Sequence, residues 1–216
     1  MTIFQKLSWM QQMGIRVLCG EVPHALERSK KPVKGASLAE LDKSLNHSKS
    51  ALSATATHPI GGTGMVPAKV MCVLEMPSAG EDKTGQPLSG PEGELLQKML
   101  SAIGLDTDTQ TYVSYLSPWR SPGSRVLTST EIQEGKALLD KRIRLVQPQI
   151  LLVFGMSVAR ALLSVPLGEA RSKVHVYQGI PVFATFAPNF LIKNTAYKKQ
   201  AWADLKKLAT FLEKHP

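Results

Sequence analysis

A chain of 216 residues is long enough for one α/β domain with a well-buried core and leaves little for a second domain. Its 43% hydrophobic residues and mixed charges exclude a disordered or fibrous protein, and no apolar run approaches the roughly 20 residues that a membrane-spanning helix needs. The formal net charge of +9 favours a polyanionic partner such as nucleic acid, although many basic domains bind none.

The N-terminal residues and the two cysteines indicate the compartment. Residues 1–6 lack the charged start and apolar block of a secretion signal. Cys19 and Cys72 stand far apart and in no CxxC spacing, so they predict neither a disulfide framework nor a closed cysteine metal site. We therefore expect a cytoplasmic protein without membrane contact, metal or other cofactor.

Residues 1–66 differ from the rest of the chain, and we expect them to form an N-terminal helical appendage with a flexible linker. Apolar residues between Phe4 and Met13 could line one face of a short helix. Ser37-Leu38-Ala39-Glu40 is the capping-box start of a second helix, which ends near Leu45. The stretch 48–64 is rich in Ser, Thr, Ala and Gly and shows no periodicity. Residues 67–216 are expected to form the main domain.

From Ala68 onward, apolar runs of strand length alternate with helical periodicities. The expected central strands are 69–74, 111–117, 149–154 and 181–186, and a further strand at 174–177 pairs with the last of these around Gly179. The expected helices are at about 95–103, 129–146, 157–163 and 196–214. This alternation predicts a three-layer α/β/α fold with a central four-stranded parallel sheet, whose ligands bind at the carboxyl ends of the strands.

The loops that begin at Glu75, Pro118 and Ala187 would lie at that edge, and three motifs surround them. The segments read LEMPSAGEDKTGQPLSGPEG (74–93), WRSPGSR (119–125) and TFAPNFLIK (185–193). In order and spacing they resemble the uracil-DNA glycosylase superfamily, most nearly its family 4, whose segments read GEAPGxxEDxxGxPFVGxAG, RPPGNR and TxHPSxLLR. The resemblance covers about residues 68–208 and implies the fold of that superfamily.

The resemblance also implies a base-cleaving site, from which this chain has lost several groups. A glycosylase flips a base out of the stack and needs a stacking face, an edge-reading side chain, a donor to the leaving base and a polar group near C1′. The resemblance places these at positions 88, 115, 187 and 75. The family has Phe, Asn and His at the first three, where this chain has Leu88, Tyr115 and Ala187. Glu75 is retained as a vestigial or water-positioning carboxylate, and the implied base pocket also contains Met76 and Pro77.

These replacements predict a lost or strongly reduced base-excision activity. A stacked base is worth about 1–3 kcal/mol, and an oxyanion donor about 3–4 kcal/mol of transition-state stabilisation. The leading hypothesis is therefore a DNA-binding protein of this superfamily that is not an enzyme. Two alternatives stay open. One is an active glycosylase of altered specificity, which uses Glu75 to hydrolyse the N-glycosidic bond of uracil or another deaminated base. The other is a protein-interaction module that meets a repair or replication protein.

Basic and polar residues of the second and third loops are the expected DNA contacts. They are Arg120, Ser124, Arg125, Asn189 and Lys193, followed by Lys198 and Lys199. Single- or double-stranded DNA is thus the expected partner, and ordinary solvated charge is the alternative. The neighbouring carboxylates at positions 81 and 82 are expected to cap a helix or loop rather than to form a catalytic pair.

The resemblance to family 4 further implies an iron–sulfur cluster, which needs four thiolates. Where the family has cysteines, this chain has Trp119, Gly135 and Ser, Ala or Thr residues near Ser50. Cys19 and Cys72 fall outside that pattern, and Cys72 lies in the middle of an expected strand, where a small buried side chain is typical. We therefore expect that this chain builds no cluster.

Overall fold

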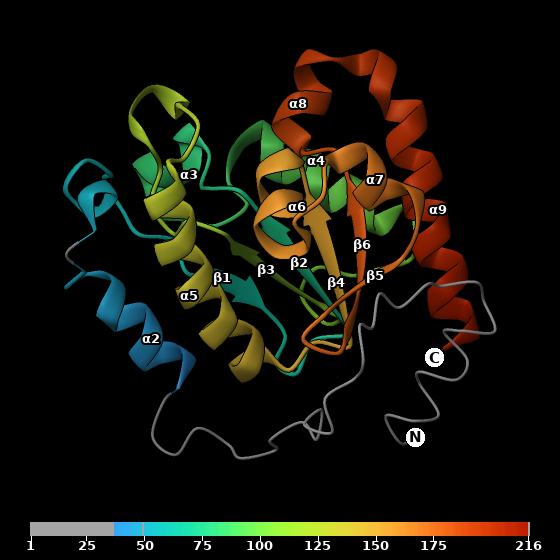
Figure 1. Ribbon diagram of the computed structural model, residues 1–216, viewed down its shortest axis with the longest axis horizontal. Coiled ribbons are helices and arrows are strands. Elements are labelled where there is room, and N and C mark those ends of the chain that lie inside the picture. The colour runs from blue at the N-terminus through green and yellow to red at the C-terminus, as the bar shows by residue number, and fades with distance from the viewer. Residues whose placement is uncertain (1–36, 49, 216) are drawn as a thin grey trace.

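The computed structural model of the protein describes residues 37–48 and 50–215 (Figure 1). The helix expected between Phe4 and Met13, together with Cys19, lies outside the described residues. No helix in the part of the chain that the structure describes is long and apolar enough to span a bilayer.

A six-stranded sheet forms the centre of the molecule, with the strand order β1-β3-β2-β4-β6-β5. The strands are β1 (Gly62–Gly64), β2 (Val70–Leu74), β3 (Thr111–Tyr115), β4 (Ile150–Phe154), β5 (His175–Tyr177) and β6 (Ile180–Thr185). The four central strands pair in parallel, as predicted, whereas β1 and β5 add antiparallel edges. The edge strand β5 corresponds to the strand expected at 174–177. The other edge strand, β1, was not predicted, because its sequence Gly-Thr-Gly carries no apolar alternation and its pairing depends on β3 as a partner.

Helices cover both faces of this sheet, which confirms the predicted three-layer fold. Their bounds are α2 (Leu38–Leu45), α3 (Ala79–Thr84), α4 (Gly90–Ser101), α5 (Ser129–Val146), α6 (Met156–Leu163), α7 (Leu167–Ser172), α8 (Pro188–Lys193) and α9 (Lys198–Lys214). Short 3-10 helices occupy Ala51–Ala54, Pro122–Ser124 and Thr195–Tyr197. Figure 1 shows α2 and α5 to one side of the strands and α9 to the other.

The side chains of β2 show how the two layers are filled. Met71 and Val73 belong to the core cluster that contains residues of α2, α5 and α6. Val70 and Cys72 belong to the cluster that contains residues of α4, α8 and α9. Because successive side chains of a strand point to opposite faces, a continuous apolar run is what a strand covered on both faces requires.

Capping boxes begin three of the helices. The side chains of Ser37, Ser78 and Thr128 accept from the backbone three residues later, where a glutamate returns the bond to the cap. The boxes at Ser37 and Thr128 confirm predicted helix starts. Glu81 is the third residue of α3 and completes the box at Ser78, which confirms its predicted capping role.

Contacts of the segment before β2 bear on the predicted domain boundary. Asp42 of α2 pairs with Arg142 of α5 at 2.5 Å, and β1 lies within the sheet. The division into an appendage at 1–66 and a domain at 67–216 stays a prediction, because residues 1–36 lie outside the described part of the chain.

Candidate functional site

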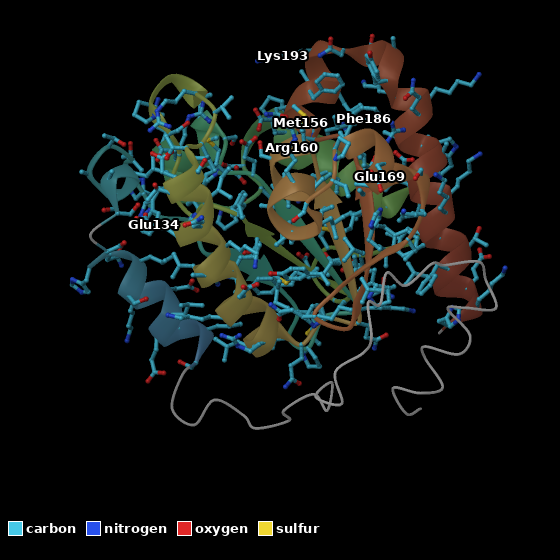
Figure 2. The ribbon with its side chains drawn as sticks, viewed as in Figure 1. Glu134, Met156, Arg160, Glu169, Phe186 and Lys193 are labelled. Carbon is cyan, nitrogen blue, oxygen red and sulfur yellow. The ribbon has the colours of Figure 1, made fainter. Side chains whose placement is uncertain are left out.

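The carboxyl ends of the parallel strands bring the three predicted loops to one edge of the sheet. β2 ends at Leu74 and β3 at Tyr115, and the amides of Leu116 and Ser117 still donate to the carbonyls of residues 74 and 75 at 2.7 and 2.9 Å. β6 ends at Thr185, directly before the third loop. Figure 2 shows Met156, Phe186 and Lys193 toward the same end of the molecule, near the start of α6 and at α8.

Tyr115 and Glu81 form a buried polar pair at the end of β3. Tyr115 is 3% exposed and Glu81 is 5% exposed. The Tyr115 hydroxyl donates to the Glu81 carboxylate, which also accepts from the backbone amides of Ser78 and Leu88 at 2.7 Å each. Burial, and next the neighbouring Glu81 charge, raise the pKa of the Tyr115 phenol well above its usual range. The phenol at the predicted edge-reading position is thus neutral and bonded within the protein.

Leu88, at the predicted stacking position, is held by the same carboxylate. Its backbone is left-handed, with φ at 61°, and its half-buried side chain packs against the α4–α8–α9 core cluster. Gly93 in α4 lies so close that an added Cβ would come within 1.9 Å of the Leu88 carbonyl oxygen. This close packing against the helix explains how a leucine is kept in a conformation that L-residues seldom adopt.

Glu75 follows β2 and Ala187 follows β6, and the two residues differ in the chemical groups that they carry. Ala187 is the N-cap residue of α8, and an added Cβ on Gly155 would come 3.3 Å from its Cβ. Its methyl group can neither donate nor accept a proton. Glu75 is half-buried, and its carboxylate accepts no hydrogen bond from the described residues. Of the four predicted site positions, Glu75 is the one that carries an unengaged charged group.

The second loop is fastened to the first by Arg120 and Ser121. Arg120 donates to the Pro77 carbonyl at 3.0 Å and to the Ser124 hydroxyl. The Met76 sulfur accepts from both the amide and the hydroxyl of Ser121 at 3.4 Å. Met76 and Pro77 therefore serve as attachment points between the two loops.

The predicted DNA-contacting residues divide into engaged and unengaged groups. Arg125 forms two hydrogen bonds to the Glu131 carboxylate, at 2.6 and 2.9 Å, and this contact lowers the pKa of Glu131 to about 2. Asn189 and Lys193 are exposed on α8, and the Lys193 ammonium has no ion-pair partner within residues 37–48 and 50–215. Among the described residues, Arg125 is thus engaged in an ion pair, whereas the charge of Lys193 is not.

Sequence reasoning missed an aromatic cluster on the third loop, formed by Phe186, Phe190 and Tyr197. Phe186 and Phe190 stack with their ring centroids 5.4 Å apart, and Tyr197 packs edge-on against them at 5.2 and 5.1 Å. The Arg171 guanidinium lies 3.9 Å from the centre of the Phe186 ring. Phe190 and Tyr197 remain 37% and 39% exposed. The sequence signal for this cluster is the pair of aromatic residues on either side of Pro188, at positions that the family motif does not assign to base stacking.

Glu92 is a second residue that sequence reasoning missed. It stands half-buried in the first turn of α4, where the family segment has alanine. Burial, and then the charge of Glu81, raise its pKa, while Arg120 and Lys193 lower it. The Glu92 carboxyl group therefore lies within electrostatic range of residues from all three loops.

The positions that correspond to the family's cysteines come together beside α5 but do not fit a cluster. The Ser50 hydroxyl donates to Glu134 at 2.8 Å, and an added Cβ on Gly135 would come within 2.2 Å of the Leu116 carbonyl. Trp119 is buried. Because positions 50, 119 and 135 are Ser, Trp and Gly, none of them offers the thiolate that a cluster needs. Cys72 is fully buried in β2, where desolvation raises its pKa to about 12. The described residues hold no group of His, Cys, Asp and Glu suited to a metal ion.

Comparisons with known proteins agree with this geometry. A family model described as the uracil DNA glycosylase superfamily matches residues 62–206. A type-4 uracil-DNA glycosylase of Sulfurisphaera tokodaii is 30% identical over 164 residues, which cover 70% of this chain and 74% of that protein. A type-4 uracil-DNA glycosylase of Archaeoglobus fulgidus is 24% identical, over 73% of this chain and 83% of that protein. A DNA polymerase of Bacillus phage SP01 is 27% identical over 72% of this chain but only 17% of the polymerase.

Proposed function

Because the chain belongs to the uracil-DNA glycosylase superfamily, we propose that it binds DNA at the carboxyl edge of its sheet, with base-excision activity lost or strongly reduced. The observation that carries this proposal is the buried hydrogen bond from Tyr115 to Glu81.

That bond occupies both groups that could read the edge of a flipped base. The Tyr115 hydroxyl has one proton to donate and gives it to Glu81, whose carboxylate already accepts two backbone amides. A base that entered the position would have to break this buried bond, and a buried polar group left unsatisfied costs about 1–3 kcal/mol. Leu88 and Ala187 offer neither a π-face nor a donor in return.

The surface around α8 supports the DNA-binding half of the proposal. The exposed rings of Phe190 and Tyr197 can stack on bases. Lys193, Lys198 and Lys199 are exposed beside them and can contact phosphates. Stacking faces combined with cations are the pairing that single-stranded nucleic acid needs, because each nucleotide presents a π-face and a phosphate.

A second candidate is an active glycosylase of altered specificity, and one observation favours it. The Glu75 carboxylate is half-buried and accepts no hydrogen bond from the described residues, so it can orient a water. Relatives that match 70–73% of this chain are named type-4 uracil-DNA glycosylases. A third candidate, a protein-interaction module, would use the same exposed rings against a repair or replication protein.

One experiment separates the three candidates. Single- and double-stranded oligonucleotides that carry uracil, hypoxanthine or xanthine are assayed for base release and for binding at two salt concentrations. The proposal expects binding that weakens with salt and no base release. Release that Glu75→Gln abolishes would establish the glycosylase instead. Absence of binding even at low salt would leave the protein-interaction module.

A further inference from the structure

A hollow lies away from the predicted loops, between α9 and the chain that links α7 to β5 and β6. Its volume is about 380 Å³, which falls within the range of small-molecule sites. The lining residues come from three segments: Arg171, Ser172, Lys173 and Val174 before β5, Phe183 and Ala184 in β6, and Asp204, Lys207, Thr210, Phe211 and Lys214 in α9. We call this hollow the α9 pocket.

Positive charge dominates the rim of the α9 pocket. Four cations stand against the single carboxylate of Asp204. That carboxylate is already satisfied, because it accepts from Arg171 at 2.6 Å and from Thr185 at 3.1 Å, and lies 3.7 Å from the Lys207 ammonium. Lys173 makes only an exposed pair with Glu169 at 3.4 Å, and Lys214 has no ion-pair partner within residues 37–48 and 50–215. The remaining charge is complementary to an anion.

The floor of the α9 pocket is apolar and aromatic. Phe183 and Phe211 pack edge to face, with their centroids 5.1 Å apart, and the His215 ring stacks on Phe211 at 4.6 Å. Val174 and Ala184 extend this surface, while the hydroxyls of Ser172 and Thr210 add neutral hydrogen-bonding groups. An apolar floor with a cationic rim suits a ligand that has a flat body at one end and a charged group at the other.

We propose that the α9 pocket binds an organic phosphate of the size of a mononucleotide, with its apolar body against the floor of the pocket and its phosphate at Lys173, Lys207 and Lys214. Two sources share this chemistry: a free mononucleotide, or the phosphorylated end of a nucleic acid strand. The inference does not depend on the proposed function, because the pocket contains none of the residues of the three predicted loops.

Arg171 connects this pocket with the aromatic cluster. Its guanidinium lines the pocket, binds Asp204, and lies over the Phe186 ring at 3.9 Å. The backbone carbonyl of Arg171 also accepts from Lys207 at 2.8 Å. This double role places the pocket next to the third loop without making it part of that loop.

Calorimetric titration of the full-length protein tests the proposal with four probes: thymidine 5′-monophosphate, thymidine, inorganic phosphate and a 5′-phosphorylated oligonucleotide. We expect the monophosphate to bind at least tenfold more tightly than thymidine, because the nucleoside lacks the charged contacts. Thr210→Trp, a change at an exposed residue of the lining, should abolish binding by filling the hollow. Lys214→Gln should weaken binding about tenfold. Lys206→Gln, an exposed residue of the same helix outside the lining, is the matched control and should change nothing.

The outcomes decide both the pocket and the source of its ligand. Monophosphate binding that Thr210→Trp removes supports a free nucleotide. Binding of the phosphorylated oligonucleotide alone, with the same sensitivity to Thr210→Trp, supports a strand end. Equal binding of thymidine and its monophosphate, or binding that both Thr210→Trp and Lys214→Gln leave intact, overturns the proposal. No binding of either phosphorylated probe at millimolar concentration overturns it as well.

Discussion

The β2–β3 half of the candidate site and its β6–α8 half use their side chains in opposite ways. At the end of β3, Tyr115 and Glu81 are buried and bonded to each other and to the backbone. Around α8, the rings of Phe190 and Tyr197 and the ammonium of Lys193 face solvent. Under the proposed function, the β6–α8 half is the surface that meets DNA, and the internal hydrogen bonds of the β2–β3 half close the position that would receive a base.

The largest effect is expected when the family's residues are restored at the predicted base-cleaving positions. Leu88→Phe, Tyr115→Asn and Ala187→His, made together, should raise uracil release from single-stranded DNA at least about a hundredfold over the unmodified protein. The reason is that one properly placed oxyanion donor alone is worth about 10²–10³ in rate. Glu75→Gln added to this variant should remove the gain. Brisk release by the unmodified protein, measured in the same assay, would mean that the pocket is not closed.

The bond between Tyr115 and Glu81 should also be visible in the stability of the fold. Tyr115→Phe removes the hydroxyl, so that the buried Glu81 carboxylate keeps its two backbone donors and loses its third donor. The free energy of unfolding should fall by about 1–3 kcal/mol, measured by urea denaturation. Tyr197→Phe is the matched control, because that hydroxyl is exposed and makes no hydrogen bond within the described residues. Equal stability of the two variants would show that the hydrogen bond from Tyr115 to Glu81 does not stabilise the β2–β3 half of the site.

In the β6–α8 half, removal of an aromatic ring should weaken the stacking of DNA bases. Phe190→Ala should weaken binding of single-stranded DNA by about 1–3 kcal/mol, measured by fluorescence anisotropy, because a stacked base loses its partner. Val126→Ala is the control, since Val126 is 77% exposed on the second loop and carries no ring. If both variants bind like the unmodified protein, the aromatic cluster has another use.

The fold was predictable where burial leaves a mark on the sequence. β2 and β4 read as continuous apolar runs because helices cover both of their faces. β1 and α7 left no such mark: β1 contains two glycines, and α7 begins after Pro166 without a side-chain cap. Both depend on neighbours that only the folded chain supplies.

The site was predictable as a set of loops but not as a set of bonds. Motif order brought Glu75, Tyr115 and Ala187 to one edge of the sheet. The partner of Tyr115 could not be read from the sequence, because Glu81 already had a sufficient local role as the end of a capping box. The ion pair of Arg125 was missed as well, because nothing in the sequence showed that its charge faces Glu131 rather than a phosphate.

Lys193 and Arg125 should contribute differently to DNA binding, because Lys193 has no ion-pair partner among the described residues and Arg125 is paired with Glu131. Lys193→Ala should reduce the slope of log affinity against log salt by about 1, since one phosphate contact releases one counterion. Arg125→Ala should change that slope less, as its guanidinium is bound to Glu131. Binding isotherms at several salt concentrations measure both variants, and a larger effect at Arg125 would reverse the assignment.

The pair of Arg125 and Glu131 should show itself instead in the acid stability of the fold. The hydrogen bonds from Arg125, and next those from Thr128, lower the pKa of Glu131 from 4.5 to about 2 in the folded state. A carboxyl group with a depressed folded pKa stabilises the fold above its unfolded pKa, and this contribution is lost as the pH falls toward the folded value. Urea denaturation from pH 6 to pH 3 should therefore show a loss of stability that Arg125→Ala makes smaller. Lys141→Ala, on the exposed face of α5 and outside every ion pair of the described residues, should leave the acid loss unchanged. Identical pH profiles for Arg125→Ala and the unmodified protein would show that Arg125 is free to meet a phosphate after all.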